Sequence, residues 1–399
     1  MRKNFVLQIF AAFILAIIAG LIFGERATVV QPLGDLFLRL IKFIIVPLIL
    51  STIVVGVTGA GNINKLGKLG GKAISYFLVT SFFAITLGLI AGFVFQPGKG
   101  IDVTPGGEAV EPAATDGVIA TLLNIIPTNP IEALTTGAVL QIIFFAIFLG
   151  VAITLVGEKA QPVQHFFDGL AEIMYKITGI VMKLVPLGIF GLLAPIVGTH
   201  GASVLMPLIK VIIAMIVAVI IHVAVVYSTA VKLLGKMSPL KFFKGIFPAA
   251  SVAFATCSSS GTLPVTMKNT QENLGVSKET SSFILPLGAT INMDGTAIYQ
   301  GLAVMFIAQY YGVDLTAAQI LIVMLMGTLA SIGAAGVPGA GLIMLTMVLT
   351  AVNLPLEGIA LVAGIDRILD MFRTSVNIVG DASACVVVEK PGTEVKKGA

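Results

Sequence analysis

Charged side chains are scarce in this sequence. Only 11% of its 399 residues are Asp, Glu, Lys or Arg, whereas 57% are hydrophobic. A water-soluble domain usually carries about 25% charged residues, so this chain has too little polar surface to cover a water-exposed body. The scarcity excludes a soluble globular protein and favours a protein surrounded by membrane lipid.

Cysteine is also almost absent. Cys257 and Cys385 are far apart in apolar surroundings, which excludes a disulfide framework and a cysteine metal site. The formal net charge of +4 comes from basic residues in loops, where they set orientation in a membrane rather than form a nucleic-acid surface. We therefore expect no nucleic-acid partner and no cofactor.

Long apolar runs are present instead. Roughly 20 apolar residues span a bilayer as a helix, and Phe5–Phe23, Leu33–Val57 and Ala73–Phe95 reach that length. The first run follows two basic residues but lacks a small-x-small cleavage site, so it predicts a retained helix rather than a signal peptide.

Basic and acidic residues between the runs predict their orientation. The N-terminal Arg2 and Lys3 and a basic loop, Thr58–Lys72, are expected in the cytoplasm. The acidic, Gly- and Pro-rich segment Gln96–Asp116 is expected outside.

Three more apolar segments complete the first half. Segment 118–156 contains Pro127 and Pro130 and is expected to be a broken helix. It is followed by Val163–Val197 and Val204–Val231, which brings the predicted spans in this half to six.

The second half interrupts its apolar segments with polar or Gly-rich runs. Phe247–Thr270 contains Cys257–Thr262, and Gln319–Thr350 contains the Gly- and Pro-rich run Ser331–Gly341. The glycines and proline of the second run do not sustain a helix, and basic residues flank the first segment on both sides, at Lys244, Lys268 and Lys278, so it starts and ends on one side. Irregular backbone at membrane depth must be buried in protein or line a cavity. Two re-entrant helical hairpins, entering from opposite sides, are therefore predicted.

Each predicted hairpin precedes a segment that is polar at mid-depth. Ser282–Tyr311 is broken at Asn292–Thr296, and Leu356–Val388 carries several charges. Interrupted segments in corresponding positions of two halves indicate the substrate site of transporters built from inverted repeats. The predicted fold is an all-α polytopic membrane protein with eight transmembrane segments, two re-entrant hairpins and inverted repeats.

The last segment carries the strongest functional signal. Five of its polar residues share one stripe of a helix at about 100° per residue: Asp366, Asp370, Arg373, Asn377 and Asp381. Ionisable groups inside a bilayer are costly and usually functional. An internal ion pair of Asp370 with Arg373 is the structural alternative, and Arg367, off the stripe, is expected to pair with Asp366.

This stripe predicts an acidic amino acid as substrate. Arg373 offers a planar fork of donors that matches a carboxylate, and Asp370 can accept an ammonium group. Asn377 and the backbone and hydroxyl donors of Ser258–Ser260 could hold the second carboxylate, because the N-terminus of a half-helix favours negative charge.

Asp294 and Asp381 remain, each where a helix breaks or ends. Oxygen ligands around a carboxylate suit a small hard cation such as sodium. Asp294 could instead cap the second half of the broken helix, since Asp-Gly-Thr also resembles a helix start.

Four motifs in this order resemble the dicarboxylate/amino acid:cation symporter family, which includes bacterial glutamate/aspartate symporters and mammalian excitatory amino acid transporters. The motifs are Ser258–Thr262, Asn292–Thr296, the Gly-rich run of the second hairpin, and the segment Asp370–Asp381. The resemblance covers essentially the whole chain.

The resemblance implies that Arg373 holds the substrate's side-chain carboxylate and Asp370 its amino group. Further substrate-binding residues would be Ser258, Ser259, Ser260, Thr296, Val337, Gly341, Thr374 and Asn377. A first sodium site would combine Asp381 with carbonyls of Gly288, Asn292 and Asn377. A second would use backbone oxygens near Met293, those of Thr290, Ser331, Ile332 and Ala334. A third would combine Asp294 and Asn292 with the hydroxyls of Thr80 and Ser81.

The resemblance also implies a homotrimer of elevator type, with the second hairpin as external gate. Scaffold helices would lie in 1–72 and, after an external loop, in 98–200. Transport-domain helices would lie in 73–97 and 201–235, the transport core in 236–388, and a cytoplasmic tail in 389–399. The protein would be a multi-pass protein of the cell membrane with both termini in the cytoplasm.

Several positions depart from the family pattern. Cys257 and Met371 stand where members often have an arginine, Phe77 where a tyrosine of the third sodium site is expected, and Gln300 where some members have a proton-carrying glutamate. Surface or packing roles are expected for the three histidines, which lie outside the motifs: His165, His200 and His222.

The predicted function is symport of glutamate or aspartate with sodium or protons, without enzymatic activity. A C4-dicarboxylate symporter, which would not need Asp370 opposite an ammonium, is the nearest alternative. An intramembrane hydrolase using Ser258–Ser260 or the pair Asp294 and Asp381 would lack a recognisable His or Lys base. It would also leave Arg373 without a role.

Overall fold

The computed structural model describes residues 3–59, 63–99, 123, 125–201, 205–330 and 340–391, and the regular elements among them are all helices. Among the described residues, five stretches are long and apolar enough to cross a membrane: Leu7–Gly59, Leu69–Phe95, Gln141–Val181, Leu205–Leu234 and Asp366–Glu389. These stretches agree with the prediction of an all-α, multi-pass membrane protein.

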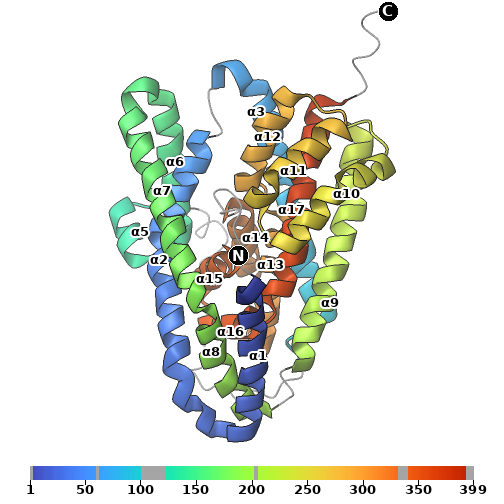
Figure 1. Ribbon diagram of the computed structural model, residues 1–399. Helices are drawn as coiled ribbons and strands as arrows, with labels where there is room; N and C mark the ends of the chain where they lie inside the picture. The colour runs from blue at the N-terminus through green and yellow to red at the C-terminus, as the bar shows by residue number, and fades with distance from the viewer. Residues whose placement is uncertain are drawn as a thin grey trace, which may run out of the picture.

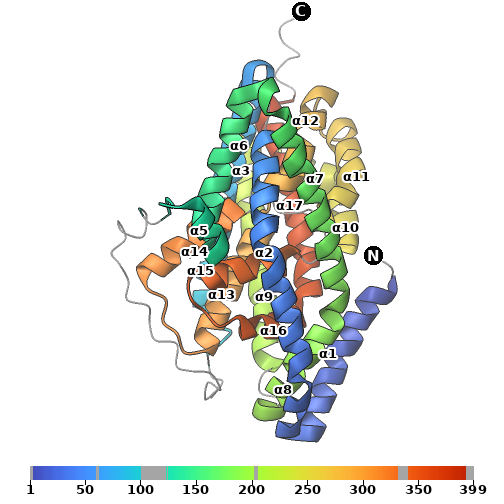
Figure 2. The same cartoon turned by 90° about the vertical axis from the view of Figure 1, so that its left-hand side faces the viewer.

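One group of helices packs mainly within itself. It consists of α1 (Lys3–Phe23), α2 (Gln31–Gly59), α6 (Val139–Val156), α7 (Gln161–Val181) and α8 (Val185–His200). In Figure 1, α2, α6 and α7 stand on the left, and Figure 2 shows the same helices from the front. Glycines allow close approach, because Gly20 lies against the α8 backbone and Gly191 against the backbone of Gly34.

The second group stands on the right of Figure 1. It consists of α3 (Ile63–Phe95), α9 (Leu205–Ile221), α10 (Pro239–Thr256), α11 (Ser259–Glu272), α12 (Lys278–Ile291), α13 (Asp294–Tyr310) and α17 (Asp366–Glu389). Gly88 of α3 lies against the carbonyl of Ile298, and Gly301 of α13 against the carbonyl of Ile85. A Cβ atom at either glycine would meet backbone, so α3 and α13 are held tightly together.

Shorter helices connect the two groups. They are α14 (Ala317–Ala330), α15 (Ala340–Ala351) and α16 (Ile359–Ala363), which contact α2, α6 or α8 on one side and α13 or α17 on the other. The described residues of the second hairpin therefore lie where the groups meet. Its predicted tip, from Ser331 onward, falls mostly in 331–339, outside the described residues.

The predicted helix breaks are confirmed for the first hairpin and the broken helix. α10 and α11 pack against each other and are joined by Cys257, whose φ of +53° is left-handed, and Ser258, whose Oγ caps α11 by accepting from the Gly261 N–H at 3.0 Å. α12 and α13 are separated by Asn292 and Met293. The serine run thus begins α11 rather than forming an irregular tip.

One expectation about the first half was wrong. The expected loop Thr58–Lys72 is largely helical, because α2 continues to Gly59 and α3 begins at Ile63. A helix satisfies its own backbone outside the bilayer as well as inside, so the spans extend beyond their apolar parts. The expected break in segment 118–156 is confirmed among its described residues. Pro130 begins the short helix α5 (Pro130–Thr136), since the first helical position needs no N–H donor, and α6 begins separately at Val139.

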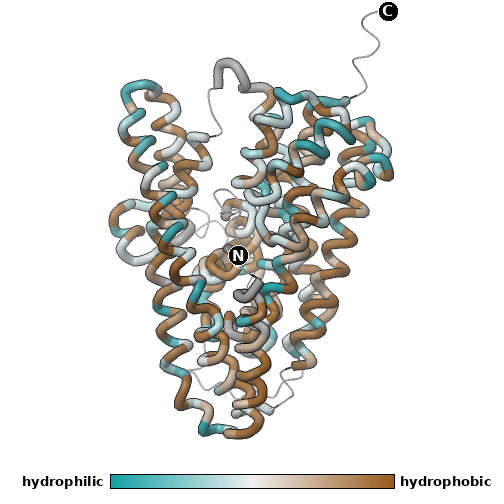
Figure 3. The backbone as a smooth tube through the Cα atoms, viewed as in Figure 1, coloured by the Kyte–Doolittle hydropathy of each residue, from teal (hydrophilic) through white to brown (hydrophobic). Residues whose placement is uncertain are grey.

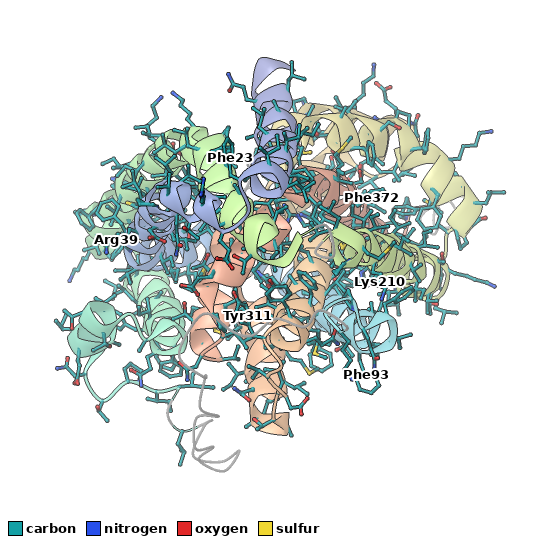
Figure 4. All side chains as sticks on the ribbon, turned by 90° about the horizontal axis from the view of Figure 1, so that it is seen from below. Phe23, Arg39, Phe93, Lys210, Tyr311 and Phe372 are labelled. Atoms are coloured by element: carbon teal, nitrogen blue, oxygen red, sulfur yellow. The ribbon has the colours of Figure 1, made fainter. Side chains whose placement is uncertain are left out.

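Hydrophobic residues predominate along most of the helices, and hydrophilic residues are frequent at their upper ends (Figure 3). Phe93 and Leu240 are 67% and 79% exposed, and the view from below places Phe93 at the periphery (Figure 4). Asp294, Arg373 and Asp381 are instead almost completely buried. Charged side chains inside and apolar side chains outside are the distribution expected of a protein surrounded by membrane lipid.

Candidate functional site

Arg373 is the largest fully buried side chain among the described residues, with 1% exposure. Its Nη1 donates to Asp366 Oδ1 at 2.8 Å, and its Nη2 lies 3.0 Å from Asp370 Oδ1. All three side chains belong to α17. The guanidinium is therefore held between two carboxylates of its own helix.

Other elements enclose the same guanidinium. Its Cζ lies 4.2 Å from the centroid of the Tyr299 ring of α13, a cation–π geometry. Gly341 of α15 is packed so closely that a Cβ atom there would lie 2.5 Å from Nη1. Arg373 thus contacts α13 and α15 as well as its own helix α17. The structure places Gly341 beside Arg373, and both were predicted to bind substrate.

The tip of the first hairpin lies beside the same part of α17. Ser375 Oγ donates to the Ala250 carbonyl of α10 at 3.1 Å, and the rings of Phe254 and Phe372 meet edge to face at 5.2 Å. The predicted serines differ in environment: Ser258 is half-buried, Ser259 is buried and Ser260 is exposed. The first turn of α11 therefore presents Ser259 to the interior.

Asn377 ties the break between α12 and α13 to α17. Its Oδ1 accepts from the Gly295 N–H at 2.8 Å, and its Nδ2 lies 3.0 Å from the Met293 sulfur. Thr374 Oγ1 donates to Asp370 Oδ1 at 3.4 Å, and Thr296 is buried one residue beyond Gly295. The predicted substrate residues of α13 and α17 therefore lie in one connected polar region.

Asp381 lies next to a buried amide oxygen that accepts no hydrogen bond from the described residues. Asn292 Nδ2 donates to Asp381 Oδ1 at 2.9 Å, while Asn292 Oδ1 has no hydrogen-bond partner among the described residues. Gly288 lies against the same carboxylate, where a Cβ atom would collide with it. A buried oxygen without a donor beside a buried carboxylate suits a small hard cation.

Asp294 is fully buried and contacts side chains of two other elements, α3 and the π-helical turn His222–Tyr227. Its Oδ1 accepts from Ser81 Oγ at 2.6 Å, and its Oδ2 accepts from Tyr227 Oη at 2.8 Å and lies 3.3 Å from His222 Nε2. No side chain caps the start of α13, so the capping interpretation of Asp294 was wrong. Thr80 Oγ1 instead donates to a carbonyl of its own helix.

The second predicted sodium site is described only in part. Met293 is buried, and Thr290 Oγ1 donates within α12, to Leu287 O at 2.9 Å. Four residues predicted for this site or for the substrate site lie outside the described residues: Ser331, Ile332, Ala334 and Val337.

Three residues of these clusters were not predicted to take part: Tyr299, His222 and Tyr227. Asp366 was predicted as a member of the polar stripe of α17 but not as a binding residue. The expected pairing of Asp366 with Arg367 was wrong, because residues seven apart lie two turns apart on one helix face, which favours Arg373. The expectation of surface or packing roles missed the contact of His222 with Asp294. A histidine in the middle of an apolar run was the available signal, whereas the two tyrosines gave none.

Comparison with known proteins gives a consistent result. Residues 5–391 match the profile of the sodium:dicarboxylate symporter family. The "Proton/sodium-glutamate symport protein" of Geobacillus stearothermophilus is 40% identical over 394 residues, 96% of this chain and 93% of that protein.

Two other relatives have different names. The "Proton/glutamate-aspartate symporter" of Escherichia coli is 38% identical over 372 residues, 90% of this chain and 84% of that protein. The "C4-dicarboxylate transport protein 1" of Ralstonia nicotianae is 36% identical over 394 residues, 97% of this chain and 92% of that protein.

Proposed function

The chain belongs to the sodium:dicarboxylate symporter family, and on this premise we propose that it carries glutamate or aspartate across the cell membrane together with sodium ions or protons. The family is one of transporters rather than enzymes. Relatives named for glutamate or aspartate symport, at 40% and 38% identity, support an acidic amino acid as substrate.

The observation that carries the proposal is the buried guanidinium of Arg373 between two carboxylates. A substrate carboxylate can take the place of one of them on the planar fork. Asp370, once released, can accept the substrate's ammonium group. The α-carboxylate would then be held by Asn377 and by the N–H groups at the start of α11, where a helix terminus favours an anion.

The coupling ions would be held by buried carboxylates. Asp381 with Asn292, Gly288 and Asn377 is one such oxygen-rich place, and its support is the unpaired Asn292 Oδ1. Asp294 with Ser81, Thr80 and Asn292 would be another, and Met293 and Thr290 would border a third. A buried carboxylate without a positive partner is costly, so an ion at either aspartate stabilises the folded site.

Asn377 would link ion binding to substrate binding. It holds Gly295 at the helix break, and the Asn292 amide approaches both its carbonyl, at 3.4 Å, and Asp381. An ion at Asp381 would therefore fix the same break that shapes the substrate site. Coupling of two sites through one shared element is what makes their binding energies depend on each other.

The predicted architecture is part of the proposal. Eight transmembrane segments and two re-entrant hairpins would form a scaffold (1–72 and 98–200) and a transport domain (73–97, 201–235 and 236–388), assembled as a homotrimer with cytoplasmic termini. The glycine contacts inside each helix group, and the smaller elements α14–α16 between the groups, support two rigid bodies that move past each other.

A C4-dicarboxylate is the second candidate substrate. Asp370 has a partner in Arg373 without any ammonium group, which is the arrangement that a substrate lacking an amine would leave in place. A relative named for C4-dicarboxylate transport supports this candidate as well.

Uptake into proteoliposomes tests both candidates. We expect labelled aspartate to accumulate when an inward sodium or proton gradient is imposed separately, and to be displaced by glutamate more strongly than by succinate. Accumulation of succinate without aspartate would replace the proposed substrate with a C4-dicarboxylate. Uptake of neither compound under either gradient would overturn symport of both.

A further inference from the structure

The cluster at Asp294 contains two residues that neither the sequence motifs nor the proposed site includes. Tyr227 Oη donates to Asp294 Oδ2 at 2.8 Å, and His222 Nε2 lies 3.3 Å from the same oxygen. All three side chains have 0% exposure. With Ser81 on Oδ1, both oxygens of the carboxylate are held by side chains of other elements.

A change of helix type places His222 and Tyr227 together. α9 ends at Ile221 and continues as a π-helical turn over His222–Tyr227. In an α-helix, residues five apart point about 140° away from each other at about 100° per residue. In a π-helix, residue i bonds to residue i+5 and lies almost above it, and such turns are frequent at functional sites.

The aromatic rings of α3 do not supply this contact. Phe77 has no hydroxyl, and the hydroxyl of the neighbouring Tyr76 lies 2.7 Å from Ser383 Oγ. The hydroxyl on Asp294 Oδ2 therefore comes from Tyr227, while Ser81 of α3 contacts Oδ1.

We propose that Tyr227 and His222 are positioning residues of the cation site at Asp294, placed by the π-helical turn. Tyr227 Oη and His222 Nε2 hold Oδ2, so that Oδ1 stays directed toward Ser81 and the ion. Tyr227 thus takes over the role of a phenol hydroxyl that Phe77 lacks. The inference rests on the proposed coupling to sodium.

The rigidity of the carboxylate is what these residues would contribute. Groups that orient a metal-binding carboxylate without touching the metal typically change metal affinity 10- to 100-fold when removed. Tyr227→Phe removes one hydroxyl and keeps the ring, and His222→Gln keeps an amide donor at a similar reach. The two variants separate loss of a donor from loss of packing.

Sodium titration of the purified full-length protein, read as the rise in melting temperature without substrate, tests the inference. Because a ligand of the folded state stabilises it by RT ln(1 + [L]/Kd), the sodium concentration that produces a fixed rise in melting temperature increases with the dissociation constant. We expect this concentration to rise about 10-fold or more in Tyr227→Phe and His222→Ala. His222→Gln should recover part of the loss, and Tyr76→Phe, whose hydroxyl contacts Ser383, should match the wild type.

A double variant makes the test specific to Asp294. In an Asp294→Asn background, Tyr227→Phe should have no further effect on the sodium titration, because interacting residues are not additive. If Tyr227→Phe leaves the sodium titration unchanged, or changes it equally with and without Asp294, the inference is overturned while the proposed function stands. A wild type that sodium does not stabilise, while aspartate does, would overturn sodium coupling and the inference together.

Discussion

Asp370 distinguishes the two candidate substrates at the scale of a single residue. Asp370→Asn removes the charge expected to meet an ammonium, while Arg373 keeps Asp366 as a partner. Loss of a hydrogen bond to a charged group costs about 1.5–3 kcal/mol, so the KM for aspartate uptake should rise about 10- to 100-fold. Succinate uptake, measured in the same vesicles, should change much less. Equal losses for both compounds would show that Asp370 does not meet the amino group.

Gly341 allows a second test at this scale. In Gly341→Ala the new Cβ atom would lie 2.5 Å from Nη1 of Arg373, so the guanidinium must move. Displacement of a binding group by about 1 Å can cost about 100-fold, and we expect aspartate affinity, measured by calorimetry, to fall at least 10-fold. The melting temperature should fall as well, because the buried guanidinium is moved relative to Asp366 and Asp370.

The matched control for this variant is Gly169→Ala in α7, where a Cβ atom meets nothing within 4 Å. It should leave aspartate affinity unchanged. Unchanged affinity in Gly341→Ala as well would mean that the position of the guanidinium does not limit binding.

Candidate site residues could be predicted from the sequence where their spacing along a single helix was enough to place them on one face. The α17 stripe follows from the spacing of its polar residues, and all five of its members are buried. Contacts between helices far apart in the sequence could not be predicted. Nothing in the spacing of Tyr227 relates its ring to Asp294, and nothing in the spacing of Tyr299 relates its ring to Arg373. The predicted binding roles themselves await the experiments.

At the scale of elements, Ser277 and Glu389 join the start of α12 to the end of α17. The Ser277 N–H and Oγ donate to the two Glu389 carboxylate oxygens at 2.8 and 2.7 Å. Ser277 Oγ also caps α12 by accepting from the Thr280 N–H. A carboxylate at the N-terminus of a helix is favourable, so this contact stabilises the junction of two helices that carry the site.

We expect Glu389→Ala and Ser277→Ala each to lower the free energy of unfolding by about 1–2 kcal/mol, followed as melting temperature. The double variant should lose less than the sum of the two, because both remove the same contact. Strict additivity would contradict a direct interaction between these side chains.

Helix breaks were predictable as elements because Gly, Asn and Ser interrupt apolar runs there. The start of α3 was not, since a helix continues into water without a change of pattern. The π-helical turn over His222–Tyr227 was not predictable either. It lies in an apolar run in which no alternation of polar and apolar residues marks the helical period.

At the scale of the whole molecule, Gly364 and Phe13 lie where the two helix groups touch. A Cβ atom at Gly364, between α16 and α17, would collide with the Phe13 ring of α1. If the two groups move past each other as proposed, Gly364→Ala should reduce the maximal rate of aspartate uptake several-fold and leave its dissociation constant within about twofold, because the new contact lies between the groups and outside the site.

Gly88→Ala is the contrasting variant, because Gly88 lies against the Ile298 backbone inside the second group. Overpacking there should lower the free energy of unfolding by about 1–3 kcal/mol. A change in aspartate affinity, with the rate preserved, in Gly364→Ala would contradict two separately moving groups.

The ion pair of Arg373 with Asp366 also matters after the substrate has dissociated. A lone guanidinium in the middle of a bilayer is expensive, and a carrier that exposed one when empty would be trapped until another substrate arrived. Because Asp366 remains paired with Arg373, the substrate-free protein can change conformation without placing an unpaired charge in the bilayer. In the proposed transport cycle, the two carboxylates on this guanidinium would allow the vacant carrier to return without substrate, as net accumulation requires.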